Sequence, residues 1–234
     1  MESKFSSFIS KSKISLFLIF ILLEKVYNTK NEITIVIDTS ISSDIIYTNY
    51  KENISEVDVN GNKSNISDYY NLLNKGINEI TIKFNKSLET CEKMFYYLDN
   101  IVIIDFLNFD SSNVKSMSWM FYKCSSIKSL NLRKFNTSSV TDMTRMFSRC
   151  SSLLSLDLRS FNTSSVRSMS WMFSECSSLK SLNIEQFDVS SVFNLNYIFY
   201  GCSSLISLNL SNFYTINSSY DITGIFDNCN PNLN

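Results

Sequence analysis

The hydrophobic residues of the second half of the chain recur every 26 positions. A Met-Phe pair stands at 94–95, 120–121, 146–147 and 172–173, and an Ile-Phe pair stands at 198–199 and, after a one-residue insertion, at 225–226. Further apolar columns lie three residues before and four residues after the first member of each pair. Such spacings place side chains on one face of a helix, so the pattern predicts one short helix in each repeat.

A second pattern follows the helical one in every repeat. After Ser-Ser comes L-x-x-L-x-L, as in Leu153, Leu156 and Leu158, and a Phe such as Phe161 closes the unit. The last two Leu alternate with polar residues, which is typical of a strand with one buried face. Each unit therefore reads as strand, turn and short helix. Stacking such units about 4.8 Å apart would build a parallel sheet and a continuous core.

The combined pattern resembles a known family of repeats. L-x-x-L-x-L leading to F-x-T-S-x-V-x-x-M-x-x-M-F-x-x-C is similar to the BspA-type leucine-rich repeat, and the resemblance covers residues 88–229. It implies an α/β fold: a right-handed leucine-rich-repeat-like solenoid of strand–turn–short helix units with a parallel sheet. It also implies a surface or secreted protein of bacteria or protists that is used for adhesion or recognition. It implies no particular ligand, because function depends on the variable positions of a fold.

The segment 28–87 precedes the repeats and has a different pattern. Strand-like runs occur at 33–37, 57–59 and 80–84, and Asn60-Gly61 follows the second run as a turn signal. A stacked array needs a cover for its terminal apolar unit. We therefore expect a β-rich N-terminal cap whose last strand starts the sheet, although a small independent domain is the alternative. Residues 230–234 are expected to form a C-terminal tail.

The first 27 residues have the pattern of a targeting segment. Lys4, Lys11 and Lys13 precede an apolar run of ten residues from Ile14 to Leu23. Spanning a bilayer takes about 20 apolar residues, so the run favours a secretory signal peptide at 1–27 and no stable membrane span after its cleavage. A buried helix and a short membrane anchor are the alternatives. The expected location is secreted or on the cell surface.

Composition narrows the function further. Charged residues make up 18% of the chain and the net charge is −1, so nothing favours nucleic acid as a partner. The chain has no His and only 4 Gly, and it carries no phosphate-binding Gly-rich motif. We therefore expect no enzyme, no cofactor and no metal.

The Cys and Met columns allow more than one interpretation. Cys124, Cys150, Cys176 and Cys202 recur once per repeat, and Cys91 stands where other repeats have Met. Exchange with Met indicates buried free thiols, while adjacent repeats would be close enough for disulfides, and a zinc site is a third reading. The Met column indicates core packing, with a metal or haem site as the alternative.

Two sets of variable positions are candidate partner-binding residues. The first follows the buried Met or Leu by two residues and should stack Arg145 between two indoles. Its members are Trp119, Arg145, Trp171 and Tyr197. The second lies on the outward side of the expected strands and comprises Asn131, Arg133, Asp157, Arg159, Asn183 and Glu185. A stabilising surface ladder is the alternative interpretation of the first set.

The sequence thus favours a secreted or cell-surface recognition or adhesion module. Its partner would be an extracellular protein or glycan, bound through the faces of the repeat array. A structural coat or matrix component and an ectodomain fragment of a larger surface receptor are the alternatives. Concentration-dependent self-association would favour the coat, and coding sequence downstream of Asn234 would identify a receptor fragment.

Overall fold

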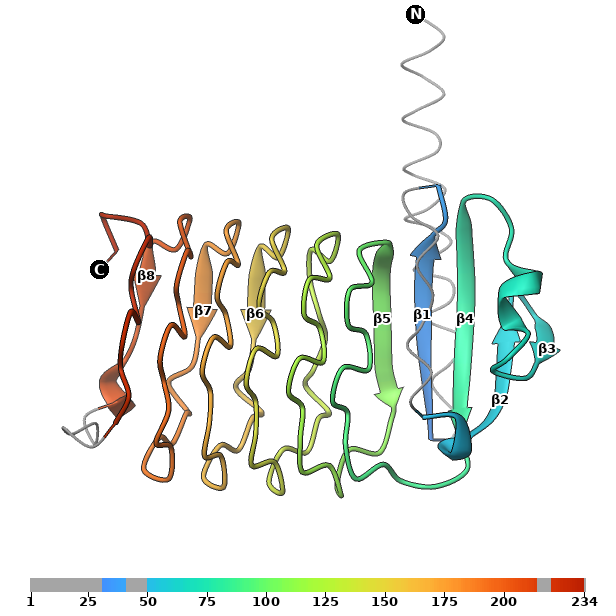
Figure 1. The fold of residues 1–234 in the computed structure, drawn as a ribbon, viewed down its shortest axis with the longest axis horizontal. Coiled ribbons are helices and arrows are strands. Elements are labelled where there is room, and N and C mark those ends of the chain that lie inside the picture. Colours follow the sequence, from blue (N-terminus) through green and yellow to red (C-terminus); the bar gives the residue numbers. More distant parts are fainter. Residues whose placement is uncertain (1–30, 41–49, 214–219, 234) are drawn as a thin grey trace, which may run out of the picture. The chain divides into compact units, whose positions relative to one another are not determined.

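The computed structural model describes residues 31–40, 50–213 and 220–233, apart from the side chain of Lys51. The elements are mainly strands joined by turns (Figure 1). The strands are β1 (Glu32–Asp38), β2 (Ile54–Val59), β3 (Asn62–Ser64), β4 (Ile77–Phe84), β5 (Ile101–Asn108), β6 (Ser155–Asp157), β7 (Ser181–Asn183) and β8 (Ser207–Leu208). Three short 3₁₀ turns are η1 (Lys51–Asn53), η2 (Tyr69–Leu72) and η3 (Ser211–Phe213).

The larger sheet is antiparallel and lies before the repeats. Its five strands follow the order β3-β2-β4-β1-β5, and each neighbouring pair is antiparallel. β2 and β3 form a hairpin in which Asn60 and Gly61, with φ of 53° and 84°, join the paired residues Val59 and Asn62. A two-residue hairpin loop favours this double positive φ, and Asn-Gly supplies it at low cost.

The three strands predicted before the repeats are confirmed as β1, β2 and β4. The expectation that the last of them starts the sheet of the repeats is wrong. β1, not β4, pairs with β5, the strand of the first repeat, and it does so antiparallel. β1 is buried over residues 32–37 because it has a neighbour on both edges and alternates Ile with Thr and Val.

The repeats form successive layers that pair with one another through their Met-Phe segments. We call these the turn segments, and they comprise residues 90–98, 116–124, 142–150, 168–176, 194–202 and 221–229. Single parallel bridges join the first residue of each segment to the next: Thr90, Ser116, Asp142, Ser168, Asn194 and Asp221. Figure 1 shows these layers side by side.

Backbone hydrogen bonds alternate along each turn segment. In segment 142–150, the amides of Met143, Arg145, Phe147 and Arg149 donate to carbonyls of the next layer at 2.8–3.0 Å. The amides of Met146, Ser148 and Cys150 donate to the carbonyl three residues earlier in the same segment, and that of Thr144 donates to Oδ1 of Asp142. Every second amide therefore closes a local turn, while the others hold two layers together.

Two positions of every turn segment have a positive φ, between 54° and 71°. The first position is Lys93, Trp119, Arg145, Trp171, Tyr197 and Gly224, and the second is Tyr97, Lys123, Arg149, Glu175, Gly201 and Asn228. A left-handed residue cannot continue a right-handed helix, and an amide bonded to another layer cannot bond to the carbonyl four residues earlier. The turn segments are therefore not helices.

The predicted α/β right-handed leucine-rich-repeat-like solenoid with a parallel sheet is wrong. The described residues contain no α-helix, and the main sheet is antiparallel. In the part of the chain that the structure describes, parallel pairing is limited to β6-β7-β8, whose strands are two or three residues long, and to the single bridges of the turn segments. The second repeat has no strand around Leu130 and Leu132, although both are buried.

The buried columns themselves are where the pattern places them. Met143, Met146 and Cys150 are fully buried, and one hydrophobic core runs from β1 to Leu205. One Phe per turn segment stacks on the next with ring centroids 5.5–5.8 Å apart, from Phe95 through Phe226. These stacked rings add directional contacts to the burial of apolar area.

All six cysteines are free thiols, and five of them are buried, as the Cys column predicts. Each thiol from Cys124 onward donates to the carbonyl of a Phe in the preceding turn segment, as Cys150 Sγ does to Phe121 O at 3.1 Å. Burial raises the pKa of these thiols, for example to about 12 at Cys202. They remain protonated at neutral pH.

The predicted signal peptide, residues 1–27, lies outside the described residues. Within the described residues, no helix has the length and apolar character needed to cross a membrane.

Candidate binding surfaces

The turn segments carry a continuous group of aromatic and basic side chains, which we call the aromatic face. It comprises Tyr96, Tyr97, Lys123, Trp119, Tyr122, Arg145, Arg149, Trp171, Tyr197 and Tyr200. Most of these side chains are partly exposed; Tyr122 is buried. They occur at the positive-φ positions or next to them, because a left-handed residue between two buried ones turns its side chain away from the core.

Arg145 lies at the centre of this face. Its guanidinium carbon stands 4.6 Å from the ring centroid of Trp119 and 4.6 Å from that of Trp171. The predicted position of Arg145 between two indoles is therefore confirmed. Tyr197 continues the column, with its ring 4.2 Å from that of Trp171. Cation–π contacts of this kind contribute about 0.5–2 kcal/mol each.

Two aromatic platforms flank Arg145. The first, in layers one and two, consists of Tyr96, Tyr97, Trp119 and Tyr122. The second, in layers four and five, consists of Trp171, Tyr197 and Tyr200. Between them, the column that holds Tyr122 and Tyr200 contains Ser148 and Ser174, so no ring bridges the platforms there.

Sequence reasoning missed six residues of this face: Tyr96, Tyr97, Tyr122, Lys123, Arg149 and Tyr200. A signal for three of them was present, because Tyr96, Tyr122 and Tyr200 occupy one column of the 26-residue repeat. A helix too would place this column beside that of Trp119, because residues three positions apart lie on one face of a helix. In the structure, the turn Trp119–Tyr122 brings these two rings to 4.8 Å.

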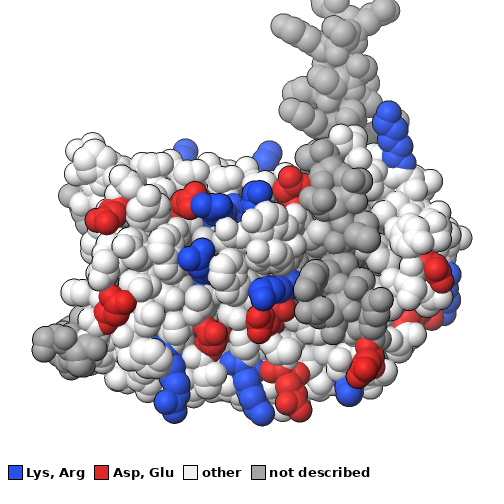
Figure 2. All heavy atoms as spheres, viewed as in Figure 1, with Lys and Arg blue, Asp and Glu red and all other residues white. Residues whose placement is uncertain are grey.

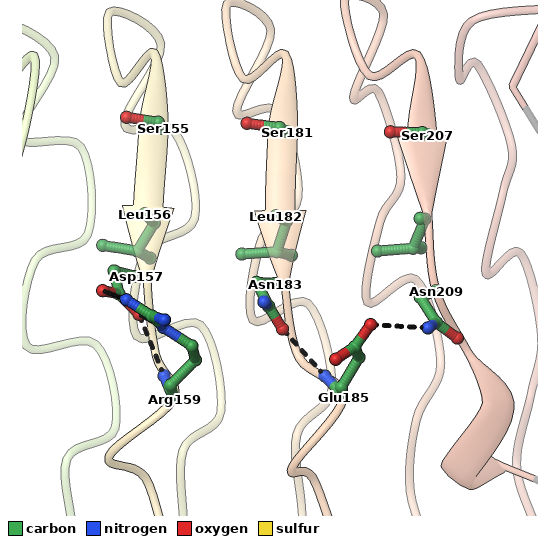
Figure 3. A pocket seen from close by; sticks show the side chains of 11 residues that line it. Ser155, Leu156, Asp157, Arg159, Ser181, Leu182, Asn183, Glu185, Ser207 and Asn209 are labelled. Carbon is green, nitrogen blue, oxygen red and sulfur yellow. Dashed lines mark hydrogen bonds and ion pairs between the residues drawn. The ribbon is translucent and has the colours of Figure 1, made fainter.

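The second candidate surface is a groove over β6, β7 and β8, with a volume of about 690 Å³ (Figure 3). Rows of matching residues cross it because these strands are parallel and in register. Its lining includes Ser155, Ser181, Ser207, Asp157, Asn183, Asn209, Arg159 and Glu185. Four of the six predicted strand-side residues therefore come together in the groove. Asn131 and Arg133 are exposed outside its lining.

The charged groups of the groove pair with other polar groups of the protein. Arg159 donates from Nε and an Nη to the two oxygens of Asp157 at 2.9 and 2.8 Å, and Arg133 approaches the same carboxylate at 3.4 Å. Hydrogen bonding by Arg159 lowers the pKa of Asp157 well below its ordinary value. Asn209 donates to Glu185 at 2.7 Å. The contacts of Asp157 with Arg159 and of Glu185 with Asn209 are drawn in Figure 3, so these four side chains are engaged within the protein.

On the described part of the face drawn in Figure 2, no large patch of one sign marks a binding surface. Figure 2 shows acidic and basic side chains interspersed over the visible face. Among the described residues, no group of three or more His, Cys, Asp or Glu could hold a metal ion. The aromatic face is therefore the surface whose chemistry is least explained by the fold alone.

A family model described as "Mycoplasma protein of unknown function, DUF285" matches the chain twice, over residues 63–180 and 89–213. No curated protein and no solved structure matches the chain. The matched residues begin in β3 and include most of the repeat layers, with both candidate surfaces. Because the two matches together span well over half of the chain, the protein belongs to the DUF285 family.

Proposed function

We propose that this protein is a non-enzymatic recognition or adhesion module, secreted or held at the cell surface, that binds a protein or glycan through its aromatic face. The partly exposed arrangement of seven aromatic rings around Arg145 carries this proposal. Packing of the core does not require it, because the buried Met, Phe and Cys columns already fill each layer. Aromatic and Arg side chains are the residues that most often dominate binding energy at interfaces.

Two features of the sequence support the proposed location. The basic and apolar pattern of residues 1–27 is that of a secretory signal, and the repeats resemble the BspA-type surface proteins. N-terminal sequencing of the protein recovered from its native cells tests the first feature. We expect the mature chain to begin near residue 28, and an intact Met1 would contradict the signal peptide.

The binding proposal is tested by a screen of the mature protein against extracellular-matrix proteins and glycans. We expect the double variant Trp119→Ala, Trp171→Ala to lose a partner that the wild type binds. The matched control is Arg133→Glu, Arg159→Glu, which alters the groove side and should leave that interaction intact. Unchanged binding by the Trp variant would overturn the aromatic face as the site.

A structural coat or matrix component is a second candidate, favoured by one observation. The C-terminal end of the repeats leaves large apolar side chains in solvent: Ile206, Ile222 and Phe226 are 58%, 48% and 45% exposed. Apolar surface of this kind promotes association. Sedimentation equilibrium over a range of concentrations tests this candidate, which requires self-association that Phe226→Ser weakens. A monomer at all concentrations would eliminate it.

A further inference from the structure

The guanidinium of Arg145 is fixed in place, but its hydrogen-bonding capacity is unused. The two indoles cover both of its faces at 4.6 Å, and the Arg145 backbone amide is held by Ser170 O at 3.0 Å. Across the described residues, no carboxylate or other side-chain acceptor pairs with its N–H groups. The side chain is partly exposed, so solvent reaches its edge.

Three of the other four arginines of the repeat layers differ in this respect, whereas the exposed Arg167 also has no carboxylate partner in the described residues but touches no aromatic ring there. Arg149 donates to Glu175 at 2.9 Å, and Arg159 and Arg133 both lie within ion-pair distance of Asp157. Each of these cations is neutralised within the protein. Arg145 is instead held only by aromatic rings, which fix its orientation without occupying its donors.

The geometry restricts what Arg145 can bind. A guanidinium is planar and carries its N–H donors in that plane, where they match the two oxygens of a carboxylate. With both faces covered, a ligand can approach only along the N–H edge. A small planar anion fits this approach, and its hydrogen bonds would be charge-assisted.

The residues around Arg145 indicate the kind of molecule to which this anion belongs. Aromatic rings lie on both sides of Arg145, and five of them are tyrosines, whose rings can lie against the apolar faces of sugars while their hydroxyls hydrogen-bond. A densely charged polyanion needs many cations. Here Arg149 is neutralised by Glu175, which leaves Arg145 and Lys123 as the face's cations without a carboxylate partner in the described residues.

We propose that the aromatic face binds an acidic glycan whose carboxylates are carried on separate sugar units. One carboxylate accepts hydrogen bonds from the edge of the Arg145 guanidinium, and neighbouring sugar rings lie on the platforms around Trp119 and Trp171. This inference rests on the proposed function, because it names the ligand class of the same surface.

The protein contains the probe for its own test. Trp119 and Trp171 are the only two tryptophans of the chain, and both contact Arg145. Intrinsic tryptophan fluorescence therefore reports directly on this site. We would titrate the mature protein with hyaluronan octasaccharide, which carries a carboxylate on every second sugar, and with 3′-sialyllactose, which carries a single carboxylate on one of its sugars. We expect a saturable change in emission with at least one of them.

Matched ligands and variants test the role of the carboxylate and of Arg145. Carboxyl-reduced forms of the same sugars should bind about tenfold more weakly or worse, and this comparison needs no variant protein. Arg145→Gln should weaken binding similarly, Arg145→Lys should restore only part of it, and Arg159→Gln should have no effect. Far-UV circular dichroism checks that each variant is folded.

Several outcomes would overturn the inference. These are the absence of any saturable change with both acidic sugars, equal binding of the carboxyl-reduced forms, and full binding by folded Arg145→Gln. Saturable binding of polyglutamate in place of the sugars would instead identify an acidic protein segment as the ligand. The proposed function survives these results if a partner from the screen still requires Trp119 and Trp171, and it fails if that partner does not.

Discussion

The antiparallel sheet and the repeat layers satisfy their backbone polar groups in different ways. In the sheet, β1 lies between β4 and β5, which are far from it in the sequence, and the hydrogen bonds run along extended strands. In the layers, alternate amides close local turns and the others reach the neighbouring layer. The backbone hydrogen bonds of each layer thus depend on the next layer along the chain. The turn segments also contain residues with positive φ, which the strands of the sheet do not.

This difference indicates which substitutions should destabilise each region. The sheet depends on long-range pairing, so its edges and hairpins fix its register. The layers depend on the repetition of a few special positions, so a defect at one of them is felt by both neighbouring layers. The following variants separate these dependencies, starting with the largest expected effect.

Removal of a ring from the middle of the Phe stack should be the most damaging change. Phe147 is fully buried between Phe121 and Phe173, with centroids 5.5 and 5.7 Å away. Phe147→Ala should lower the free energy of unfolding by about 3–5 kcal/mol, measured by urea denaturation. Phe226→Ala, at the exposed end of the same stack, is the control and should cost much less. Equal losses would show that the stack does not act as a core.

Removal of a buried hydroxyl that joins two layers should have the second-largest effect on stability. Thr137 Oγ1 donates to Asn162 O at 2.9 Å and accepts from Asn162 N at 2.8 Å. Thr137→Val removes both bonds and should cost about 1–3 kcal/mol, because it leaves the amide and carbonyl of Asn162 without this partner. Thr137→Ser is the matched control, since Ser111 makes the same two bonds with Asn136. A loss as large for Ser as for Val would contradict this account.

The positive-φ positions can be tested at an exposed site. Lys123 has a φ of 62°, and Gly201 occupies the same place three layers later. Lys123→Val should lower the free energy of unfolding by about 1–2 kcal/mol, because a β-branched residue is strained there. Lys123→Gly should change it by less than about 0.5 kcal/mol, since relief of strain offsets the greater freedom of the unfolded chain. Both variants lose the same contact with Tyr97, so urea midpoints compare them directly.

Low pH should lower the stability of both regions, and the effect of each single carboxylate should be the smallest of those predicted here. Ion pairs with Lys63 and Lys83 lower the pKa of Glu56 in the sheet to about 2, and Arg159 lowers the pKa of Asp157 in the layers. A carboxylate whose folded pKa is lowered stabilises the fold above its ordinary pKa, and this contribution is lost as the pH falls toward the folded pKa. The melting temperature of the protein should therefore fall as the pH is lowered from about 4.5 to 2.

Glu56→Gln and Asp157→Asn divide this acid sensitivity between the sheet and the layers. Each variant should melt lower than the wild type at pH 6 and approach it at pH 2. A difference between wild type and Glu56→Gln that stays constant from pH 6 to pH 2 would mean that the ion pairs of Glu56 are not responsible.

The regularity of the sequence predicts burial better than it predicts backbone. Strands β1, β2 and β4 follow from alternating Ile, Val and Thr, and the Asn60-Gly61 turn follows from its residue types. The Met143, Met146 and Cys150 columns are buried as predicted in layers one to five, while Ile222, Ile225 and Cys229 of the last layer are partly or largely exposed. Spacings of three and four, however, suit overlapping turns as well as a helix. The choice between them depends on amides that bond to another layer, a contact that no local pattern records.

The candidate site is predicted only in part by the sequence. The column of Trp119, Arg145 and Trp171 could be read from the repeat, because stacking in register follows from the 26-residue period. The column of Tyr96, Tyr122 and Tyr200 also recurs in the repeat, and a spacing of three places it beside the first column in a helix as well as in the observed turn. The sequence does not show, however, that Asp157 already neutralises Arg159 while Arg145 lacks such a partner in the described residues.

The column of buried thiols has a consequence for local unfolding. Layers one to five each carry one fully buried cysteine, and the last carries the half-buried Cys229. A thiol that is sheltered and protonated reacts with an alkylating reagent only when its own layer opens. The rate at which each cysteine acquires the reagent, followed by mass spectrometry, therefore measures the opening free energy of each layer in the unmodified protein. Comparison of these rates along the chain would show how the opening free energy of the layers changes from the antiparallel sheet to the last repeat.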